Sequence, residues 1–457
     1  MTLGKTLLKH LLNVKDAVIE GYELVDDEQG VKSLYIDLHP TKAHADRCPV
    51  CGKRCAGYDQ PNKTPTVWRH LDFTGIRVFL RHRTRRVQCP EHGVVTASVP
   101  WAFDQSCFTT AFDMTVGWLS KELSKSAIAT YMRIDWKTVG RCINRVLKVL
   151  EPDSSSRLDN LVRIGIDETS RTKGHNYITV VVNHDTNTVV WAKEGHSAEV
   201  LNSFFDELTD AQKQSIKYVT CDGAQWIKTV VEKRIPHAVR CLDRFHVAQW
   251  ATDFIDKLRC KLWREQSILS ASLTKEAKMN EALTKDERDA KLELARAVKK
   301  AADDVKGAMY VFGKSQENLT EKQLIKQQML FARHPTLEKA YRYKEQLKEV
   351  FNFATSKLAE AALKAWYYSA SHCHIPEIKE LAKKVWRHRA AIINTVEHKL
   401  SNARIEANNT KIKLIIRKAY GFRNIESLIS MVKLICSNLS IPLPNTPEWF
   451  KVFKCGH

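Results

Sequence analysis

Two aspartates that follow short apolar runs could hold divalent cations. Asp167 follows the alternating stretch 161–166, which predicts a β-strand that ends on this carboxylate. Asp222 follows a second β-rich run, residues 218–221, and precedes a glycine that predicts a turn into a helix. Ligands of α/β sheets bind beyond the carboxyl ends of the strands, and carboxylate oxygens suit Mg²⁺ or Mn²⁺. The pair therefore indicates a metal site. Glu168, the neighbour of Asp167, is a weaker candidate for a metal ligand, because adjacent strand residues point to opposite faces.

A third carboxylate is needed, because a lone aspartate after a strand is more often a helix cap or a turn residue. Residues 401–424 have helical periodicity, with an apolar stripe beside a polar face. The stripe holds Ile405, Ile412, Ile416 and Ala419, and the polar face holds Asn402, Glu406, Asn409 and Lys413. Glu406 is the third candidate. Two ions held by the three carboxylates could support an in-line phosphoryl displacement.

Two pairs of sulfur and nitrogen ligands near the N-terminus predict a zinc site. The four residues are Cys48, Cys51, Cys89 and His92. Each pair has two intervening residues in the form C-P-x-[CH]-G, which lets a knuckle turn direct both side chains at one ion, and four such ligands form a closed tetrahedral Zn²⁺ site. Cys55 and His82 compete for the same role. The protein has 12 cysteines and no export signal, so thiols and metal ligands are expected in place of disulfides.

The net charge of +20 is spread along the chain and indicates a polyanionic partner. The chain has 457 residues, of which 44% are hydrophobic, as expected of a folded protein with several domains. No apolar run is long enough for a transmembrane helix, and the N-terminus lacks a signal-peptide pattern. A cytoplasmic protein without membrane contacts is expected.

Two segments could contact DNA. The strand-like run 77–86 is basic and includes Arg83, Arg85 and Arg86, so phosphate contact competes with an ordinary solvated face. Residues 108–150 predict helices with a short break at 133–135, as in a helix-turn-helix. The helix after the break is expected to present Lys137, Thr138, Arg141 and Arg145 outward, with Val139, Ile143 and Val146 inward. A three-helix packing unit without DNA contacts is the alternative.

The order of elements after a polar linker favours an RNase H-like fold. The pattern predicts a strand at 161–166, a hairpin at 177–192, a helix at 197–208, strands at 217–221 and 238–242, and a helix between these two strands. This order places the first aspartate on the first strand and the second on the fourth. Residues 256–387 are helical and rich in lysine, which predicts an all-α insertion before Glu406.

The predicted fold class is multidomain α+β. It combines an N-terminal zinc-binding β module, a helix-turn-helix and an RNase H-like α/β catalytic domain interrupted by an all-α insertion. The predicted ranges are 1–100 for the zinc-binding module, 101–150 for the helix-turn-helix, 151–160 for a linker, 161–255 and 388–436 for the catalytic domain, 256–387 for the insertion and 437–457 for a tail.

Four motifs together resemble the DDE transposases of the ISL3 insertion-sequence family, the IS204/IS1001/IS1096/IS1165 type. They are G-I-D-E at 165–168, C-D-G at 221–223, S-N-x-x-I-E-x-x-N-x-x-I-K at 401–413 and A-Y-G-F-R-N at 419–424. The resemblance covers almost the whole chain. Ala407 stands where glycine is more usual, and His92 stands where the family's zinc module commonly has cysteine. The resemblance also implies a supporting role near the site for Asp243 and His246, which match an Asp- or Cys-x-x-His motif.

The resemblance implies a bacterial, nucleoid-associated transposase. Such an enzyme binds the terminal inverted repeats of its element as double-stranded DNA, and uses two Mg²⁺ or Mn²⁺ ions for 3′-end cleavage and strand transfer. A homo-oligomer on DNA, a dimer in particular, and one structural Zn²⁺ are expected. The alternative is a catalytically silent DNA-binding regulator derived from a transposase. A zinc hydrolase is disfavoured, since a closed four-ligand site has no open position for water.

Overall fold

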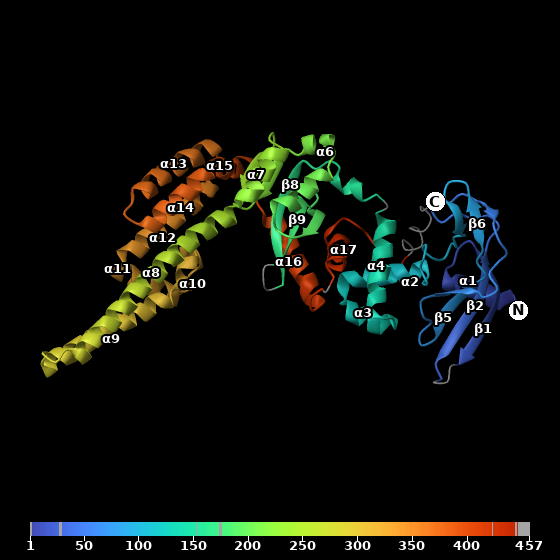
Figure 1. Cartoon of the computed structure of the whole chain (residues 1–457), viewed down its shortest axis with the longest axis horizontal. Helices are drawn as coiled ribbons and strands as arrows, with labels where there is room; N and C mark the ends of the chain where they lie inside the picture. The colour runs from blue at the N-terminus through green and yellow to red at the C-terminus, as the bar shows by residue number, and fades with distance from the viewer. Residues whose placement is uncertain are drawn as a thin grey trace. The chain divides into compact units, whose positions relative to one another are not determined.

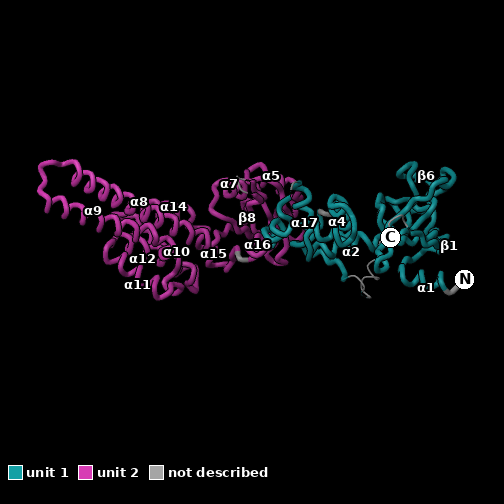
Figure 2. The backbone as a smooth tube through the Cα atoms, turned by 90° about the horizontal axis from the view of Figure 1, so that it is seen from below, with its two compact units in different colours: residues 1–157, 411–457 teal, residues 158–410 magenta. Residues whose placement is uncertain are grey.

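The computed structural model describes residues 2–26, 30–151, 153–172, 176–422, 424–443 and 446. The chain forms two compact units, which Figure 2 distinguishes by colour. Unit 1 comprises residues 1–157 and 411–457, and unit 2 comprises residues 158–410. None of the helices in these described ranges combines the length and the apolar character needed to span a bilayer.

The N-terminal part of unit 1 is a helix followed by a four-stranded sheet of order β1-β2-β5-β4. The helix is α1 (Thr2–Leu12), and the strands are β1 (Ala17–Asp26), β2 (Lys32–Pro40), β4 (Thr66–Arg69) and β5 (Arg77–His82). Strands β1 and β2 form an antiparallel hairpin after the helix, and residues 27–29 between them lie outside the described residues. The alternate residues Ile36 and Leu38 of β2 pack with Val78 and Leu80 of β5 in one core.

A second, smaller sheet of order β3-β6-β7 lies in the same unit. Its strands are β3 (Ala56–Gly57), β6 (Arg86–Cys89) and β7 (Gly93–Thr96). The tight turn between β6 and β7 places Gly93 at a φ of 70°, a left-handed conformation that glycine adopts without steric cost. The sequence between Cys89 and Gly93 is therefore a knuckle that joins two antiparallel strands.

Three helices follow in unit 1, and each begins at a side-chain cap. They are α2 (Thr110–Glu122), α3 (Lys125–Met132) and α4 (Trp136–Leu150), capped by Thr109, Ser124 and Asp135. Arg133 ends α3 in the left-handed conformation, which forms the predicted break. The buried Val139, Ile143 and Val146 face the interior as predicted. From the C-terminal segment, α17 (Ile425–Cys436) packs against α2 and α4.

A five-stranded sheet of order β10-β9-β8-β11-β12 forms the centre of unit 2. Its strands are β8 (Arg163–Thr172), β9 (Asn176–Asn183), β10 (Thr188–Glu194), β11 (Tyr218–Cys221) and β12 (Val239–Leu242). The first three are antiparallel neighbours, whereas β8, β11 and β12 are parallel. Helices α5 (Ala198–Asp206), α6 (Asp210–Ser215) and α7 (Gln225–Arg234) form the connections, and the 3₁₀ turn η1 (Ser154–Leu158) lies in the predicted linker. The predicted order of strands and helices is confirmed, with α6 as an addition.

One detail of the strand prediction is wrong. The strand that carries Asp167 does not end there, because β8 continues to Thr172 and stays paired with β9. Its parallel pairing with β11 stops earlier, at Gly165. Asp167 therefore lies just beyond the point where β8 and β11 separate, whereas Asp222 directly follows the end of β11.

The elements between β12 and the last helices of unit 2 are helical throughout. The α-helices are α8 (Arg244–Met279), α9 (Lys285–Lys306), α10 (Met309–Gly313), α11 (Glu321–Arg333), α12 (Pro335–Glu349), α13 (Ser356–His372), α14 (Pro376–Arg387) and α15 (Arg389–His398), and the 3₁₀ turns are η2 (Gln316–Asn318) and η3 (Val350–Asn352). The long α8 begins directly after β12, so the helical segment starts before residue 256. Figure 1 shows α8 and α9 side by side as a hairpin.

The helix α16 (Ala403–Lys418) carries the candidate Glu406. Its residues up to Thr410 belong to unit 2, and those from Lys411 onward belong to unit 1. In unit 2 it lies beside β8 and β9 (Figure 1), and the contacts described below hold it there.

Candidate functional site

The four predicted zinc ligands form a cluster in unit 1. Their ligand atoms all lie within 4.8 Å of one another, the one such group of at least three His, Cys, Asp or Glu residues in the described ranges. The Sγ atoms of Cys51 and Cys89 are 3.7 Å apart, and His92 Nδ1 lies 3.7 Å from Cys48 Sγ and 3.5 Å from Cys89 Sγ. With Zn–S near 2.3 Å and Zn–N near 2.0–2.1 Å, a tetrahedron has S–S edges of about 3.8 Å and S–N edges of about 3.6 Å. The observed spacings fit Zn²⁺.

Local backbone geometry explains the preformed cluster. The Cys48–Cys51 turn is closed by Gly52 N–H, which donates to Cys48 O at 3.0 Å with Gly52 at a φ of 69°. Burial raises the pKa of the Cys89 thiol, but hydrogen bonds from the backbone of Glu91 and His92 outweigh it and lower that pKa to about 7. Cys89 therefore favours the thiolate, which is the form that binds zinc, whereas at Cys51 the hydrogen bond with the Lys53 backbone is outweighed by burial and the neighbouring thiols, which raise its pKa.

Cys55 and His82, the two competing candidates for zinc ligands, contact other groups. Cys55 Sγ is 3.3 Å from Lys53 O and outside the four-residue group, although neighbouring Cys89 and Cys48 contribute to raising its pKa, after burial. His82 packs edge-on against Trp101, with ring centroids 5.7 Å apart. The structure therefore favours the predicted set of four over these alternatives.

The helix after the break presents fewer basic groups than the sequence suggested. Lys137 and Arg141 are exposed on α4. Thr138 is buried, with its hydroxyl bonded to the cap residue Asp135. Arg145 donates from Nε and Nη2 to the two oxygens of Asp113, at 2.9 and 2.7 Å. The prediction that Thr138 and Arg145 point outward is wrong, because the cap and a buried carboxylate engage them.

The arginines of the basic run 77–86 also divide into an exposed side chain and side chains held in ion pairs. Arg83 is exposed. Arg85 forms a two-point ion pair with Asp46, and Arg86 Nε donates to Asp59 Oδ2 at 2.7 Å. Both pairs leave part of the guanidinium accessible. Of the three predicted phosphate-contacting arginines, Arg83 thus has the side chain with most freedom to meet DNA.

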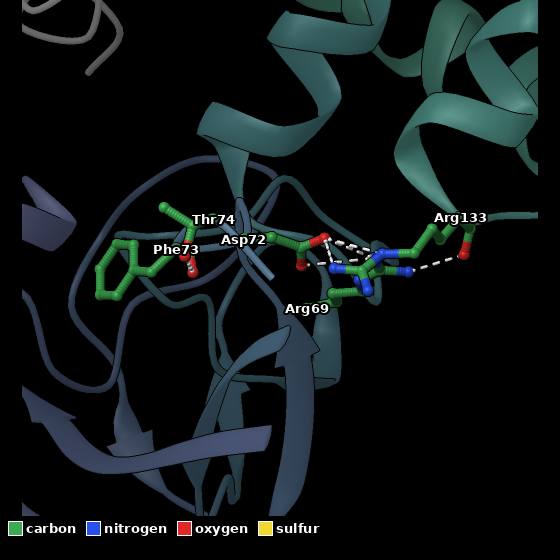
Figure 3. A network of polar contacts seen from close by, with 5 residues as sticks. All are labelled: Arg69, Asp72, Phe73, Thr74 and Arg133. Atoms are coloured by element: carbon green, nitrogen blue, oxygen red, sulfur yellow. Dashed lines mark hydrogen bonds and ion pairs between the residues drawn. The ribbon is translucent and has the colours of Figure 1, made fainter. Parts of the chain in front are cut away.

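An ion-pair network ties the break in the helix-turn-helix to the N-terminal sheet (Figure 3). Asp72 Oδ2 accepts hydrogen bonds from Arg133 Nε and Arg69 Nη2, both at 3.2 Å. Arg69 Nη1 also donates to the backbone oxygen of Arg133 at 2.8 Å. Asp72 therefore holds the side chain, and Arg69 the backbone, of the residue that separates α3 from α4. The sequence gives little sign of this network, since Arg133 is far from Arg69 and Asp72 in the chain.

In unit 2, Asp167 and Asp222 lie within electrostatic reach of each other. Burial raises the pKa of Asp167 to about 6, and the negative charge of Asp222 adds to the increase. Asp222 Oδ1 accepts a hydrogen bond from Ala224 N at 2.9 Å, which fixes the turn after β11. A Cβ on Gly223 would lie 2.1 Å from a ring carbon of Trp250, so only glycine permits this turn to pack on α8. The two predicted aspartates thus interact electrostatically, but within the described ranges they form no close group of three ligands like the zinc cluster, and Glu406 is not among the charges that shift the pKa of Asp167 or Glu168.

Glu168 is closer to this site than strand alternation suggested. Burial raises the pKa of Glu168 to about 7, with further increases from the charges of Asp222 and Asp167. The alternation itself holds, since Asp167 and Thr169 share one face of β8 and both contact Asn409. The carboxylate of Glu168 nevertheless remains within electrostatic reach of both aspartates. The lower ranking of Glu168 as a metal ligand stays a prediction.

Close packing and hydrogen bonds seat α16 on β8. A Cβ on Gly165 would lie 2.1 Å from Ile405 Cδ1, so glycine at this strand position lets the helix approach. Arg404 donates to the backbone oxygen of His184, and Asn409 Nδ2 donates to Asp167 Oδ2 at 2.7 Å. Glu406 lies one helical turn before Asn409 and is exposed. The helix that carries Glu406 is thus bonded to Asp167 itself.

Asp243 and His246 flank the two aspartates. Asp243 is buried, and its Oδ2 lies 3.1 Å from His246 Nδ1. The hydrogen bond with Asp243 raises the pKa of His246 against the effect of burial, and the charges of Asp243, Asp167 and Asp222 add to the increase. A protonated His246 would reduce the repulsion between the carboxylates. Their predicted position near the site agrees with this arrangement.

The acidic site has little compensating charge from the protein, since His246 and Lys384 interact with its carboxylates only at a distance or through Asp243. In the described ranges, no lysine or arginine forms an ion pair with Asp167, Glu168, Asp222 or Glu406. Buried carboxylates without a counterion are costly, and a divalent cation with oxygen ligands is one way to compensate them. The donor set fits Mg²⁺ or Mn²⁺.

Two further residues lie at this site but were not predicted as site residues. Thr169 is buried and bonded to Asn409. Asn402 is also buried, its backbone N–H donates to Asp243 Oδ1 at 3.4 Å, and neither polar atom of its side chain has a hydrogen-bond partner. The polar stripe of residues 402, 406 and 409 was the available signal for the asparagines.

Comparison with known protein families matches consecutive parts of the chain. Residues 44–92 match the zinc-finger of transposase IS204/IS1001/IS1096/IS1165, residues 97–147 match the helix-turn-helix domain of transposase family ISL3, and residues 164–432 match a family described as transposase. The zinc cluster, the three-helix segment and the α/β unit therefore together define a transposase. The chain belongs to the ISL3 family of insertion-sequence transposases.

Curated relatives resemble the chain over nearly its full length. The transposase for insertion sequence element IS1557 of Mycobacterium tuberculosis is 38% identical over 443 residues, which is 96% of this chain and 97% of the relative. The transposase for insertion sequence element IS1001 of Bordetella parapertussis is 25% identical over 428 residues, or 93% of this chain and 96% of the relative. The predicted family is confirmed.

Proposed function

We propose that this protein is an active DDE transposase of a bacterial insertion sequence. It would bind the terminal inverted repeats of its element and catalyse Mg²⁺- or Mn²⁺-dependent 3′-end cleavage and strand transfer. Asp167, Asp222 and Glu406 are the proposed metal ligands. The observation that carries this proposal is the hydrogen bond from Asn409 to Asp167, which joins the helix of Glu406 to the strand of Asp167.

The sheet topology supports an RNase H-like catalytic domain. Three antiparallel strands, followed by two strands parallel to the first, give the central position to β8, which carries Asp167. The helices α8–α15 separate β12 from α16 in sequence. We interpret them as an insertion, because α16 returns to β8 after them.

The chain's own residues would bind the divalent ions, orient the metal ligands and balance part of their negative charge. A bound pair of divalent ions would supply charge compensation and an activated oxygen nucleophile at the phosphate. Asp167 and Asp222 would hold these ions beyond the separation of β8 and β11, and Glu406 would approach from α16. His246, oriented by Asp243, would balance part of the negative charge around the site. No covalent enzyme intermediate is required.

The N-terminal part of the chain would recognise the terminal inverted repeats of the element. Lys137 and Arg141 on α4 are positioned for DNA contacts, and Arg83 is a candidate for phosphate contact. The zinc ion would stabilise the small sheet beside them through Cys48, Cys51, Cys89 and His92. We expect a homo-oligomer on DNA, a dimer in particular, because two ends must be joined to one target.

Incubation of the purified full-length protein with a plasmid that carries both element ends tests this proposal. Strand-specific nicks at the 3′ ends and joined products should form with Mg²⁺ and disappear with EDTA, while end binding persists in EDTA. Specific end binding without cleavage in either Mg²⁺ or Mn²⁺ would instead support the silent regulator. Removal of residues 1–158 should abolish specific end binding and leave weak, salt-sensitive binding. This result would assign recognition of the element ends to residues 1–158.

A further inference from the structure

Asn409 bridges two residues of one strand face. Its Nδ2 donates to Asp167 Oδ2 at 2.7 Å, and its Oδ1 accepts a hydrogen bond from Thr169 Oγ1. Asn409 is 7% exposed and Thr169 is 1% exposed, so water competes little with either bond. The second oxygen of Asp167, Oδ1, accepts the backbone N–H of Glu168 at 2.8 Å. Both oxygens of Asp167 are therefore oriented by the protein.

The carboxylate of Asp167 fixes which way the amide points, and the Thr169 hydroxyl then holds the amide in that orientation. The Thr169 hydroxyl can donate to the amide oxygen while the NH₂ group is directed at the carboxylate of Asp167. The reversed amide would place its oxygen against a carboxylate oxygen, which is repulsive. The chain Thr169, Asn409, Asp167 thus has a single favourable direction of hydrogen bonding.

A neutral amide suits a carboxylate that must also bind a cation. Lysine or arginine at this position would orient Asp167 but would also neutralise it, and so would compete with a metal ion. An amide N–H occupies one lone pair of Oδ2 and leaves the charge of the carboxylate, and the other lone pairs, available for a metal. Residues that hydrogen-bond to metal ligands in this way commonly set the ligand's orientation.

We propose that Asn409, held in orientation by Thr169, is a positioning residue that fixes the carboxylate of Asp167 for divalent-cation binding while it seats the helix of Glu406 on β8. This inference rests on the proposed role of Asp167 as a metal ligand. Asn409 itself does not contact the metal or the DNA. Because one side chain performs both tasks, the strand carboxylate and the helix carboxylate are placed by the same bond.

The neighbouring Asn408 provides a matched control. It lies on the same helix and is 0% exposed. Its Nδ2 donates to Asn187 Oδ1 at 3.2 Å and to Arg404 O at 3.0 Å. Replacement of Asn408 therefore weakens the packing of α16 but removes no hydrogen bond to the carboxylate of Asp167.

The test compares Asn409→Ala, Thr169→Val, Thr169→Ser and Asn408→Ala in the full-length protein. Mn²⁺ binding to DNA-free protein is measured by electron paramagnetic resonance, and the site is defined as the Mn²⁺ signal lost in Asp167→Asn. Asn409→Ala and Thr169→Val should bind Mn²⁺ about tenfold more weakly, in the range known for partners of metal ligands. Thr169→Ser, which keeps the hydroxyl, should bind as the wild type does. The Mg²⁺ concentration for half-maximal cleavage should shift in parallel.

Asn408→Ala should lower the melting temperature as much as Asn409→Ala does, but should weaken Mn²⁺ binding much less, because it leaves the hydrogen bond to Asp167 in place. Equal Mn²⁺ affinity in Asn409→Ala and the wild type would overturn the inference, as would an equal loss in Asn408→Ala, since both show a purely structural role. If Asp167→Asn itself retains Mn²⁺ binding and cleavage, the proposed function fails instead. Should Asn409→Ala not fold, the pair Thr169→Val and Thr169→Ser decides the question alone.

Discussion

The zinc cluster of unit 1 and the carboxylate site of unit 2 are both predicted metal centres, but their ligands are assembled in different ways. The zinc ligands come from two knuckle turns, and the protein alone holds their atoms at spacings close to the edge lengths of a tetrahedral zinc site. The carboxylates come from β8, from the end of β11 and from α16. A closed structural site can be preformed by local turns, whereas a site that must admit a phosphate is built from distant elements.

The zinc cluster and the carboxylate site also differ in the pKa shifts of their ligands. In the zinc cluster, backbone hydrogen bonds favour the charged thiolate of Cys89, so the ligand is prepared for its ion. In the carboxylate site, burial and neighbouring negative charge raise the pKa values of Asp167 and Glu168, so the charged state is strained without a cation. The first site should therefore retain its metal during purification, and the second should bind and release its metal readily.

The largest expected effect is on catalysis. Asp167→Asn, Asp222→Asn and Glu406→Gln should each reduce end cleavage and strand transfer by roughly a thousandfold or more, because a neutral amide is a poor ligand for a hard cation. End binding and melting temperature should stay close to those of the wild type. Glu168→Gln should have a milder effect. A Glu406→Gln protein that cleaves element ends at nearly the normal rate in Mg²⁺ would remove this residue from the site.

Loss of zinc should have the next largest effect, and it should be confined to unit 1. Purified protein should contain about one Zn²⁺ per chain, and Cys51→Ser should release it and unfold the small sheet, because structural zinc contributes directly to folding. Elemental analysis and limited proteolysis measure both changes. Stoichiometric zinc in a Cys48→Ser/Cys89→Ser double variant would refute the assignment of the four ligands.

The basic residues of α4 should divide into two groups. Lys137→Ala/Arg141→Ala should weaken binding to element ends about 10- to 100-fold and reduce its salt dependence, with little change in stability. Arg145→Ala should instead destabilise the protein by about 3 kcal/mol, because it leaves the fully buried Asp113 without its counterion. Salt-controlled binding assays and urea unfolding distinguish the groups. Wild-type stability in Arg145→Ala would contradict the structural role of this residue.

The smallest effect concerns pH. The pKa values of Asp167 and Glu168 are raised to about 6 and about 7, mainly by burial. Their contribution to the stability of the metal-free fold is therefore complete below about pH 4 and is lost as the pH rises through these values. Mg²⁺ needs the deprotonated carboxylates, so the rise in melting temperature that it causes should be near zero at low pH and about a few degrees at pH 7.5. Asp167→Asn should abolish most of this rise.

Local patterns were sufficient for much of the fold. Strand alternation, helical periodicity and the break at 133–135 predicted β9, β10, α3 and α4 within a few residues, because these elements depend on neighbours in the sequence. They missed the continuation of β8 beyond Asp167, because a strand with polar residues is stabilised by pairing with β9, a tertiary contact. The orientation of Arg145 was missed for the same reason, since its partner Asp113 lies on another helix.

The sequence by itself determined the family, the four zinc ligands and the three candidate carboxylates, because fixed spacings within short motifs carry this information. Only the tertiary structure decided which basic residues remain free for DNA, how near Glu168 lies to the two aspartates, and that Asn409 connects α16 to Asp167. Ion pairs and hydrogen bonds between residues far apart in the chain have no signature in sequence spacing. They arise when packing, here Ile405 against Gly165, brings distant segments within bonding distance.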